Sequence, residues 1–193
     1  MTATCCDEPL LVPSSRRALV AKVRGTVIEI GPGAGSNLTY LPGDVRWIGV
    51  EPSSHNRRRL RQTAARLGQA IDLRDGVAEH LPMPDNSVDA VLGTLVLCSV
   101  TDPVRVLSEV RRVLKPGGVY AFEEHIAAPR GTWTCRYQRI MGLLGVIVGG
   151  CRPNRDTHLD IAAAGFAALE STSWSRPGPF GTTISFISGV ATS

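Results

Sequence analysis

The sequence contains no uninterrupted run of about 18 apolar residues, which is the length that a membrane-spanning helix needs. Its first residues also lack the basic-then-apolar pattern of a secretory signal. Aromatic residues make up only 5% of the 193 positions, but 43% of all residues are hydrophobic, which is enough for a packed core. We therefore expect one cytoplasmic domain, covering residues 1–193, without a membrane span.

Cysteines and histidines are few and scattered. They are Cys5, Cys6, Cys98, Cys135 and Cys151, and His55, His80, His125 and His158. The odd number of cysteines and the lack of CxxC pairs argue against a disulfide framework and a structural zinc site. No HxxxH spacing places two imidazoles on one helical face. The sequence therefore predicts free thiols and no bound metal.

The formal net charge is +4. Much of this excess lies in one predicted helix, at Arg57, Arg58, Arg59, Arg61 and Arg66. A surface for nucleic acid would also need nearby aromatic side chains on which bases stack, and the segment has none. We interpret these arginines as a solvated helix face and expect no nucleic-acid partner.

Short β-branched runs alternate with helical patterns along most of the chain. The predicted strands are residues 26–30, 46–51, 70–74, 87–94, 119–124, 169–174 and 182–190, and the predicted helices are about 14–24, 52–67, 102–114, 136–148 and 155–164. The KPGG segment at 115–118 is predicted to stop the third helix. This alternation predicts an α/β fold with a mostly parallel seven-stranded sheet, helices on both faces and a C-terminal antiparallel hairpin.

Ligands bind beyond the carboxyl ends of the strands in such a sheet, so the residues after each strand form the candidate site. The first strand ends in Glu29-Ile-Gly31-Pro-Gly33-Ala-Gly35. Its glycines let a ligand lie against backbone amides, and its acidic residue can face an amino group. The dinucleotide fingerprint GxGxxG would need glycine where this chain has Ser36, which counts against an NAD-dependent oxidoreductase.

Four further strand ends complete the candidate site. Glu51 can accept hydrogen bonds from both hydroxyls of a ribose. Residues 76–79 would border an adenine ring, and the apolar residues within 94–99 would form the floor of the pocket. The fifth place is residues 123–125.

Together these motifs resemble class I S-adenosylmethionine-dependent methyltransferases over residues 26–118. The resemblance depends on the ExGxGxG loop, the GVEPS strand end, LPMPDNSVDAV and LKPGG, in the family's order and spacing. A narrower likeness, to small methyltransferases related to alkyl thiol S-methyltransferases, depends on NLTYLP at 37–42, GTLVLCSV at 93–100, residues 124–128, Trp133, and residues 150–151 and 154–155. The resemblance implies a Rossmann-like fold and S-adenosylmethionine as the cofactor.

The resemblance also implies a role for individual residues. The methionine end of the cofactor would be held by Glu29, Gly31, Gly33, Gly35 and Asn37, the ribose by Glu51, the adenine by Pro52, Ala78 and Glu79, and the sulfonium by Thr94 and Leu95. Many family members place an aspartate against the adenine amino group where this chain has Val77. That contact is expected to pass to Glu79 or to the backbone of Ala78.

Methyl transfer depends mainly on alignment and the exclusion of water, because the methyl group is already activated by a cationic sulfur. A thiol with a pKa of about 8.5 is partly ionised at pH 7, so a weak base is sufficient. His125 follows a strand that points at the methyl group and is the candidate catalytic base. The alternative is a histidine that only orients a loop or packs beneath the substrate.

The least generic part of the chain, residues 126–165, is expected to form the substrate chamber. The candidate substrate-binding residues are Cys98, Trp133, Tyr137, Met141 and Cys151. The helix predicted at 136–148 is apolar almost all round, which is typical of a core helix or of the cap of an apolar pocket. A membrane-lying helix is less favoured because the segment lacks a rich basic face. The two cysteines are expected to be small apolar lining groups.

We expect this protein to methylate the free thiol of a small molecule, as a monomer or homodimer. The alternatives are an O- or N-methyltransferase acting on a small molecule or lipid headgroup, and a non-catalytic cofactor-binding module. Within the domain, residues 1–25 would form an N-terminal arm and helix, 26–125 the cofactor-binding core, 126–165 the substrate-side helices and 166–193 the C-terminal strands.

Overall fold

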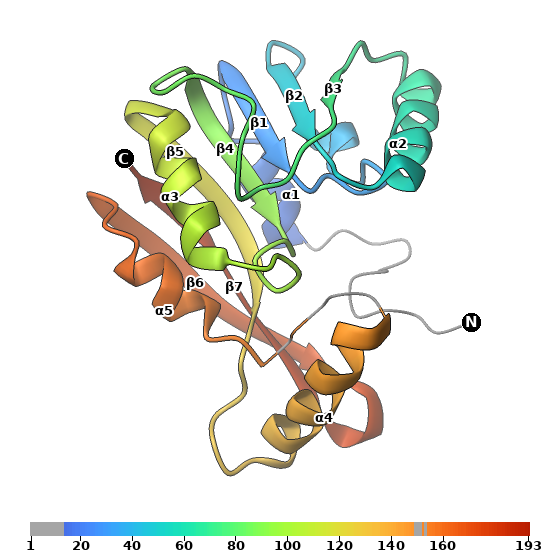
Figure 1. Cartoon of the computed structure of the whole chain (residues 1–193), viewed down its shortest axis with the longest axis vertical. Helices are drawn as coiled ribbons and strands as arrows, with labels where there is room; N and C mark the ends of the chain where they lie inside the picture. Colours follow the sequence, from blue (N-terminus) through green and yellow to red (C-terminus); the bar gives the residue numbers. More distant parts are fainter. Residues whose placement is uncertain (1–13, 149–151, 153) are drawn as a thin grey trace.

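One mixed sheet organises the chain in the computed structural model, which describes residues 14–148, 152 and 154–193. The strand order is β3-β2-β1-β4-β5-β7-β6 (Figure 1). The strands are β1 (Thr26–Ile30), β2 (Arg46–Val50), β3 (Asp72–Arg74), β4 (Val88–Thr94), β5 (Leu114–Ile126), β6 (Ala168–Pro177) and β7 (Thr183–Thr192). The pairs are parallel except that β7 runs antiparallel to both β5 and β6. This confirms the expected mostly parallel seven-stranded sheet with its C-terminal antiparallel strands.

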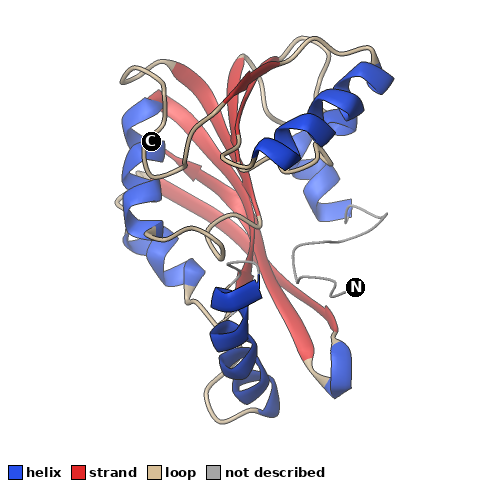
Figure 2. Ribbon diagram, turned by 45° about the vertical axis from the view of Figure 1, so that its right-hand side comes forward, coloured by secondary structure: helices blue, strands red, loops and turns tan. Residues whose placement is uncertain are grey.

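Helices cover both faces of the sheet (Figure 2). They are α1 (Ser14–Val20), α2 (Ser54–Leu67), α3 (Pro103–Val113), α4 (Trp133–Val148) and α5 (Thr157–Ala163), with short 3-10 turns η1 (Leu38–Tyr40) and η2 (Pro179–Gly181). On one face, α3 and α5 contribute Val106 and Ile161 to a core around Tyr120 of β5. On the other face, Leu19 of α1 packs over β1, β4 and β5, and Leu60 of α2 lies in a cluster with β2. No helix in the described ranges is long and apolar enough to span a bilayer.

Two element boundaries differ from the sequence expectation. The first helix ends at Val20 rather than near residue 24, because the chain turns at Gly25 (φ 71°) to enter β1. The fifth strand begins at Leu114, directly after α3, so the KPGG segment lies inside the strand. Its pairing with β4 shifts register after Val88, and Gly117 takes a φ of 76°, so the segment forms an irregularity rather than a separate turn.

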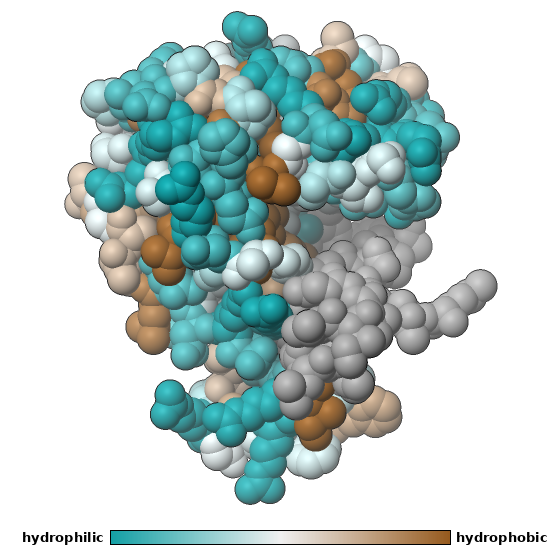
Figure 3. All heavy atoms as spheres, in the orientation of Figure 1, coloured by the Kyte–Doolittle hydropathy of each residue, from teal (hydrophilic) through white to brown (hydrophobic). Residues whose placement is uncertain are grey.

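The surface of the face in Figure 3 is mainly hydrophilic. Arg57 of α2, however, is not part of a solvated helix face as expected. Its side chain is 14% exposed and donates hydrogen bonds to the backbone oxygens of Glu51 (2.7 Å) and Pro52 (2.8 Å). It also contacts both carboxylate oxygens of Asp75, at 2.7 and 2.9 Å. Arg57 therefore fastens α2 to the ends of β2 and β3, a bidentate arrangement that lysine could not reproduce.

Candidate active site

A cavity of about 630 Å³ opens beyond the carboxyl ends of β1, β2 and β4, where the strand order reverses. Its lining comes from the loop after β1, the end of β2, the start of α2, residues 77–79, the loop after β4, and Arg16 of α1. Eight of the predicted cofactor residues line it, namely Gly31, Gly33, Glu51, Pro52, Ala78, Glu79, Thr94 and Leu95. The fold thus gathers four of the five predicted strand ends around one cavity.

The backbone conformation of the loop after β1 explains why it is rich in glycine. Gly31, Gly33 and Gly35 have φ values of 58°, 55° and 87°, a region that side chains strongly disfavour. A Cβ at Gly31 would lie 3.1 Å from Val96, and one at Gly35 would collide with Leu60. A Cβ at Gly33 would meet no protein atom within 4 Å. Gly33 therefore presents a bare backbone to the cavity, while the other two glycines permit close packing beneath it.

Glu51 lies at the end of β2 with its carboxylate beside the glycine loop. One oxygen accepts a hydrogen bond from the backbone N–H of Gly33 at 3.0 Å. The other accepts from the backbone N–H of Ser53 at 2.9 Å and from the Asn56 amide at 3.4 Å. The side chain is thus fixed in place, and a carboxylate retains further lone pairs for a ligand.

Glu29 and Asn37 lie under the loop and do not line the cavity. The Glu29 carboxylate accepts hydrogen bonds from the Asn37 amide (2.8 Å) and the Trp47 indole (2.9 Å). The same Asn37 amide donates to the Thr94 hydroxyl at 3.0 Å, so these residues join β1, β2 and β4. Burial raises the pKa of Glu29 to about 7, against the lowering effects of these two hydrogen bonds and of the charge on Arg16. The direct partners of Glu29 are therefore protein groups that support the loop.

Residues 77–79 form the opposite end of the cavity. Ala78 is buried, whereas Val77 is 46% exposed at the position where the family often has aspartate. The Glu79 carboxylate accepts from the backbone N–H of Thr101 at 2.9 Å and so joins this segment to the loop after β4. The side chain of Glu79 is thus engaged in holding the cavity wall.

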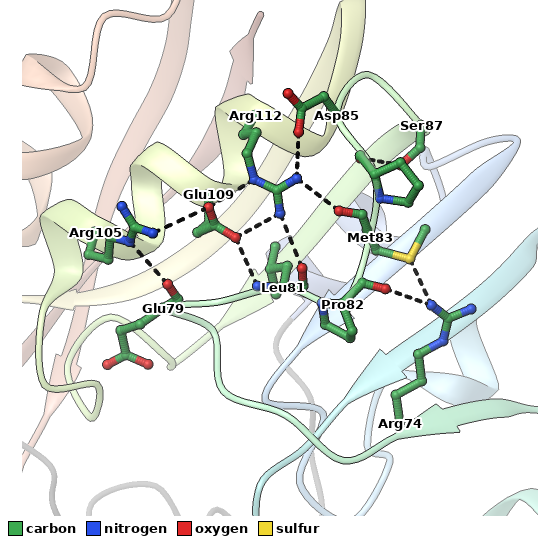
Figure 4. Close-up of polar contacts among 11 residues, drawn as sticks. Arg74, Glu79, Leu81, Pro82, Met83, Asp85, Ser87, Arg105, Glu109 and Arg112 are labelled. Atoms are coloured by element: carbon green, nitrogen blue, oxygen red, sulfur yellow. Dashed lines mark hydrogen bonds and ion pairs between the residues drawn. The ribbon is translucent and has the colours of Figure 1, made fainter.

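A partly buried ion pair between Arg112 and Glu109 holds the LPMPDN loop (Figure 4). Arg112 of α3 pairs with both carboxylate oxygens of Glu109 at 2.8 Å and donates to the backbone oxygens of Leu81 and Met83 and to Asp85. Glu109 also accepts from the Leu81 N–H at 2.9 Å. The hydrogen bonds from Arg112 lower the pKa of Glu109 to about 2. The prolines of this loop disfavour helical geometry in the residues before them, but only the tertiary contacts reveal what fixes the loop.

Comparison with known proteins identifies the family. Human thiol S-methyltransferase TMT1B is 34% identical to this chain over 169 residues, which are 81% of this chain and 69% of that protein. Residues 28–122 match the family described as a methyltransferase domain. The chain belongs to the S-adenosylmethionine-dependent methyltransferases.

Two solved structures share the fold of this methyltransferase. YcgJ from Bacillus subtilis has a TM-score of 0.71 at 18% identity, over 92% of this chain and 95% of its own. A SAM-dependent methyltransferase from Thermotoga maritima has a TM-score of 0.65 at 24% identity, over 93% and 87% of the two chains. The cavity fits the cofactor of this family, because Gly33 leaves open space for it and the Glu51 carboxylate faces that space.

The loop after β4 is held in an unusual conformation by residues that the sequence did not single out for this role. Leu95 has a φ of 59° and donates its backbone N–H to the backbone carbonyl oxygen of Glu123 at 2.8 Å. One carboxylate oxygen of Glu124 accepts the N–H groups of Val96 (2.9 Å) and Leu97 (3.0 Å). Strain of this kind persists only where the surroundings enforce it, and here it shapes the cavity wall.

Arg155 fixes the other end of the same loop. Its guanidinium donates to the backbone oxygens of Leu97 and Val100, both at 2.6 Å, and of Thr101 at 3.3 Å. In the sequence, Arg155 contributed only to the resemblance, as part of residues 154–155. The role of Arg155 becomes visible only when the fold brings these three carbonyl groups together, and no sequence pattern predicts it.

The candidate base of the methyltransferase, His125, lies near the end of β5 and is 3% exposed. Its ring contacts that of Phe186 on β7 at a centroid distance of 4.7 Å, and its backbone oxygen accepts a hydrogen bond from Thr157. It does not line the cavity of about 630 Å³. His125 does share a sheet face with Glu123, two residues earlier on the strand.

The candidate substrate residues lie in two places. Cys98 is fully buried in the loop after β4, where its thiol donates to the Leu95 oxygen at 3.5 Å. Trp133 and Tyr137 of α4 contact Phe180 at the tip between β6 and β7, rather than the cavity. The side chain of Met141, and the whole of Cys151, fall outside what the structure describes.

The two predicted substrate-side helices are placed differently. Gln138 ties α4 to the segment after β5, accepting from the Ala128 N–H at 2.7 Å. α5 instead contributes Ile161 to the core beneath α3. Within the described ranges, no three His, Cys, Asp or Glu residues are grouped so as to hold a metal ion.

Proposed function

We propose that this methyltransferase acts on the sulfur of a small-molecule thiol. The observation that supports this proposal is the 34% identity to human thiol S-methyltransferase TMT1B across 81% of the chain. S-adenosylmethionine supplies a methyl group already activated by a cationic sulfur. The protein therefore has to bind, align and shield the reactants rather than protonate a leaving group.

For the cofactor, we propose an arrangement along the cavity. Its methionine end would lie over Gly31 and Gly33, and the Glu51 carboxylate would accept the ribose hydroxyls. The adenine would lie between Pro52 and Ala78. The sulfonium would then face Thr94 and Leu95, at the end of β4. In this arrangement Glu29, Gly35 and Asn37 support the loop from below.

The acid–base groups near the expected methyl position favour an easily ionised acceptor. Glu29, Glu123 and Glu124 are all buried, and each accepts hydrogen bonds from at least two protein donors. Each of these carboxylates is thus already engaged as a hydrogen-bond acceptor by protein groups. A thiol needs little assistance, because its pKa of about 8.5 leaves a few per cent as thiolate at pH 7. A hydroxyl acceptor would need a much stronger base.

His125 is the proposed base for the thiol. It lies on β5 beyond Glu123, and imidazole titrates near neutral pH. The alternative role for His125 is structural. In that role it positions β5 against β7 through its contact with Phe186 and takes no proton.

A competition among matched acceptors tests the proposed reaction. Phenylmethanethiol, phenylmethanol and phenylmethanamine share one scaffold and differ in the methyl-accepting atom. Each is incubated with the enzyme and S-adenosylmethionine, with enzyme-free reactions as blanks, and products are followed by mass spectrometry. Vesicles containing phosphatidylethanolamine test the lipid alternative. We expect at least 100-fold faster turnover of the thiol; equal or faster methylation of oxygen, nitrogen or lipid would refute thiol specificity.

A further inference from the structure

Arg16 is a buried charged residue of α1 that also lines the cofactor cavity. It is 5% exposed, and its Nε donates to one carboxylate oxygen of Glu123 on β5 at 2.7 Å. The second oxygen of Glu123 accepts from the Ser15 hydroxyl at 3.0 Å. Glu123 itself is 0% exposed. These contacts fix the guanidinium plane and neutralise one charge with another.

The hydrogen-bond capacity of this guanidinium is not used up. Within the described part of the chain, the Arg16 Nη2 atom is enclosed and has no hydrogen-bond partner. A buried guanidinium N–H without an acceptor is costly, so such atoms usually face water or a ligand. Because Arg16 lines the cavity, a bound ligand can provide the missing acceptor.

The position of Arg16 identifies the end of the cavity to which it belongs. Its charge acts on Glu29, which lies under the glycine loop, and its partner Glu123 pairs in register with Thr94 at the end of β4. Ala78 and Val77 lie at the other end. Arg16 therefore faces the part of the cavity that we assign to the methionine end of the cofactor.

We propose that Arg16 binds the carboxylate of the cofactor's methionine moiety through its guanidinium, and that Glu123 is the positioning residue that orients the guanidinium. This carboxylate is the anionic group of S-adenosylmethionine, and a guanidinium matches its geometry. Binding would also join α1 to the loops after β1 and β4. The inference depends on the proposed cofactor placement but not on which atom of the acceptor is methylated.

The test compares S-adenosylmethionine with its decarboxylated analogue, which keeps the adenosine, sulfonium and amine but lacks the carboxylate. Dissociation constants are measured by calorimetry without an acceptor, for the wild type and for Arg16→Lys. We expect Arg16→Lys to weaken binding of the intact cofactor at least tenfold and of the decarboxylated analogue less than twofold. Ser15→Ala is the matched control, because it removes a Glu123 contact but keeps the guanidinium; both ligands should change less than threefold.

A second variant covers the case in which Arg16→Lys folds poorly. Arg16→Gln combined with Glu123→Gln removes both members of the buried ion pair, leaves no unpaired charge, and should show the same selective loss. Equal weakening for both ligands would mean that Arg16 only supports the fold, and this would overturn the proposal. Unchanged affinity for the intact cofactor would also overturn the proposal. This holds even if a separate activity assay showed a higher KM for the acceptor, because Arg16 would then act on the acceptor and not on the cofactor. A failed cofactor placement would instead show as unchanged affinity after Glu51→Gln.

Discussion

Replacing Gly33 by alanine tests the cofactor site with a methyl-sized probe. Gly33 has a φ of 55°, and a Cβ there would point into open space within the cavity. Gly68, which ends α2, has a φ of 66° and also has nothing within 4 Å of a Cβ. Gly68 does not line the cavity, so Gly68→Ala matches the backbone strain without the expected ligand contact.

The magnitudes follow from these two positions. An L-residue in the left-handed region costs about 1–2 kcal/mol, so both variants should lose that much unfolding free energy in urea. At Gly33, the methyl group would also occupy volume that we assign to the cofactor. We expect affinity for S-adenosylmethionine to fall at least tenfold, or about 1.4 kcal/mol, in Gly33→Ala and less than twofold in Gly68→Ala.

Calorimetric titration and urea unfolding of the two variants provide the decisive comparison. Equal affinities in Gly33→Ala and Gly68→Ala would refute the placement of the cofactor over the glycine loop. A stability loss more than about 1 kcal/mol greater in Gly33→Ala would show that the added methyl group meets protein rather than open space. Gly31 and Gly35 are unsuitable for this test because their Cβ atoms would contact Val96 and Leu60.

Three further predictions concern single side chains. Glu51→Gln should weaken cofactor binding at least tenfold in calorimetry, because an amide accepts from ribose hydroxyls less well than a carboxylate does. Glu109→Gln should cost about 2 kcal/mol of urea stability at neutral pH, because its folded-state pKa of about 2 lies below the ordinary 4.5. His125→Ala should lower kcat/KM at pH 7 about 100-fold, and activity should recover as the pH passes the thiol's own pKa of about 8.5.

A specific result would contradict each of these three predictions. Unchanged affinity in Glu51→Gln would remove Glu51 from the ribose site. The stabilising effect of Glu109 is present above about pH 4.5 and lost as the pH falls towards 2, so the stability difference between wild type and variant should shrink at pH 3; a constant difference contradicts the ionic origin. His55→Ala, on the exposed start of α2, controls for His125, and a pH-independent loss in His125→Ala would indicate a positioning role instead.

Local patterns were sufficient for most of the fold. The β-branched run at 26–30 and the helical pattern at about 102–114 are both local patterns, and they appear as β1 and α3. The KPGG segment was predicted to stop the third helix and to precede the fifth strand, because glycine and proline usually interrupt regular structure. It lies inside β5, where Leu114 and Val119 on either side of it pair with β4 and Gly117 and Gly118 exchange backbone hydrogen bonds with Ser193, contacts that no local pattern encodes.

The candidate site divides in the same way. Gly33 and Glu51 were identified from spacing, since strand ends in a parallel sheet meet at one edge. Arg57 was assigned to a solvated helix face, and Arg155 entered only as part of the resemblance. The carbonyl partners of Arg155 lie more than 50 residues earlier in the chain, and the Asp75 partner of Arg57 follows the next strand, so only the folded chain shows that both arginines hold the walls of the cavity.

The sequence by itself therefore determined the alternation of strands and helices, the glycine loop and the acidic strand end, because each is a local pattern of residue types. Only the tertiary structure decided which polar groups are already engaged. It placed Glu29 with Asn37 and Trp47 under the loop, and it brought Arg16 from α1 to Glu123, more than 100 residues away, at the edge of the cavity. Burial makes these pairings specific, because a charge removed from water must find its partner wherever the fold provides one.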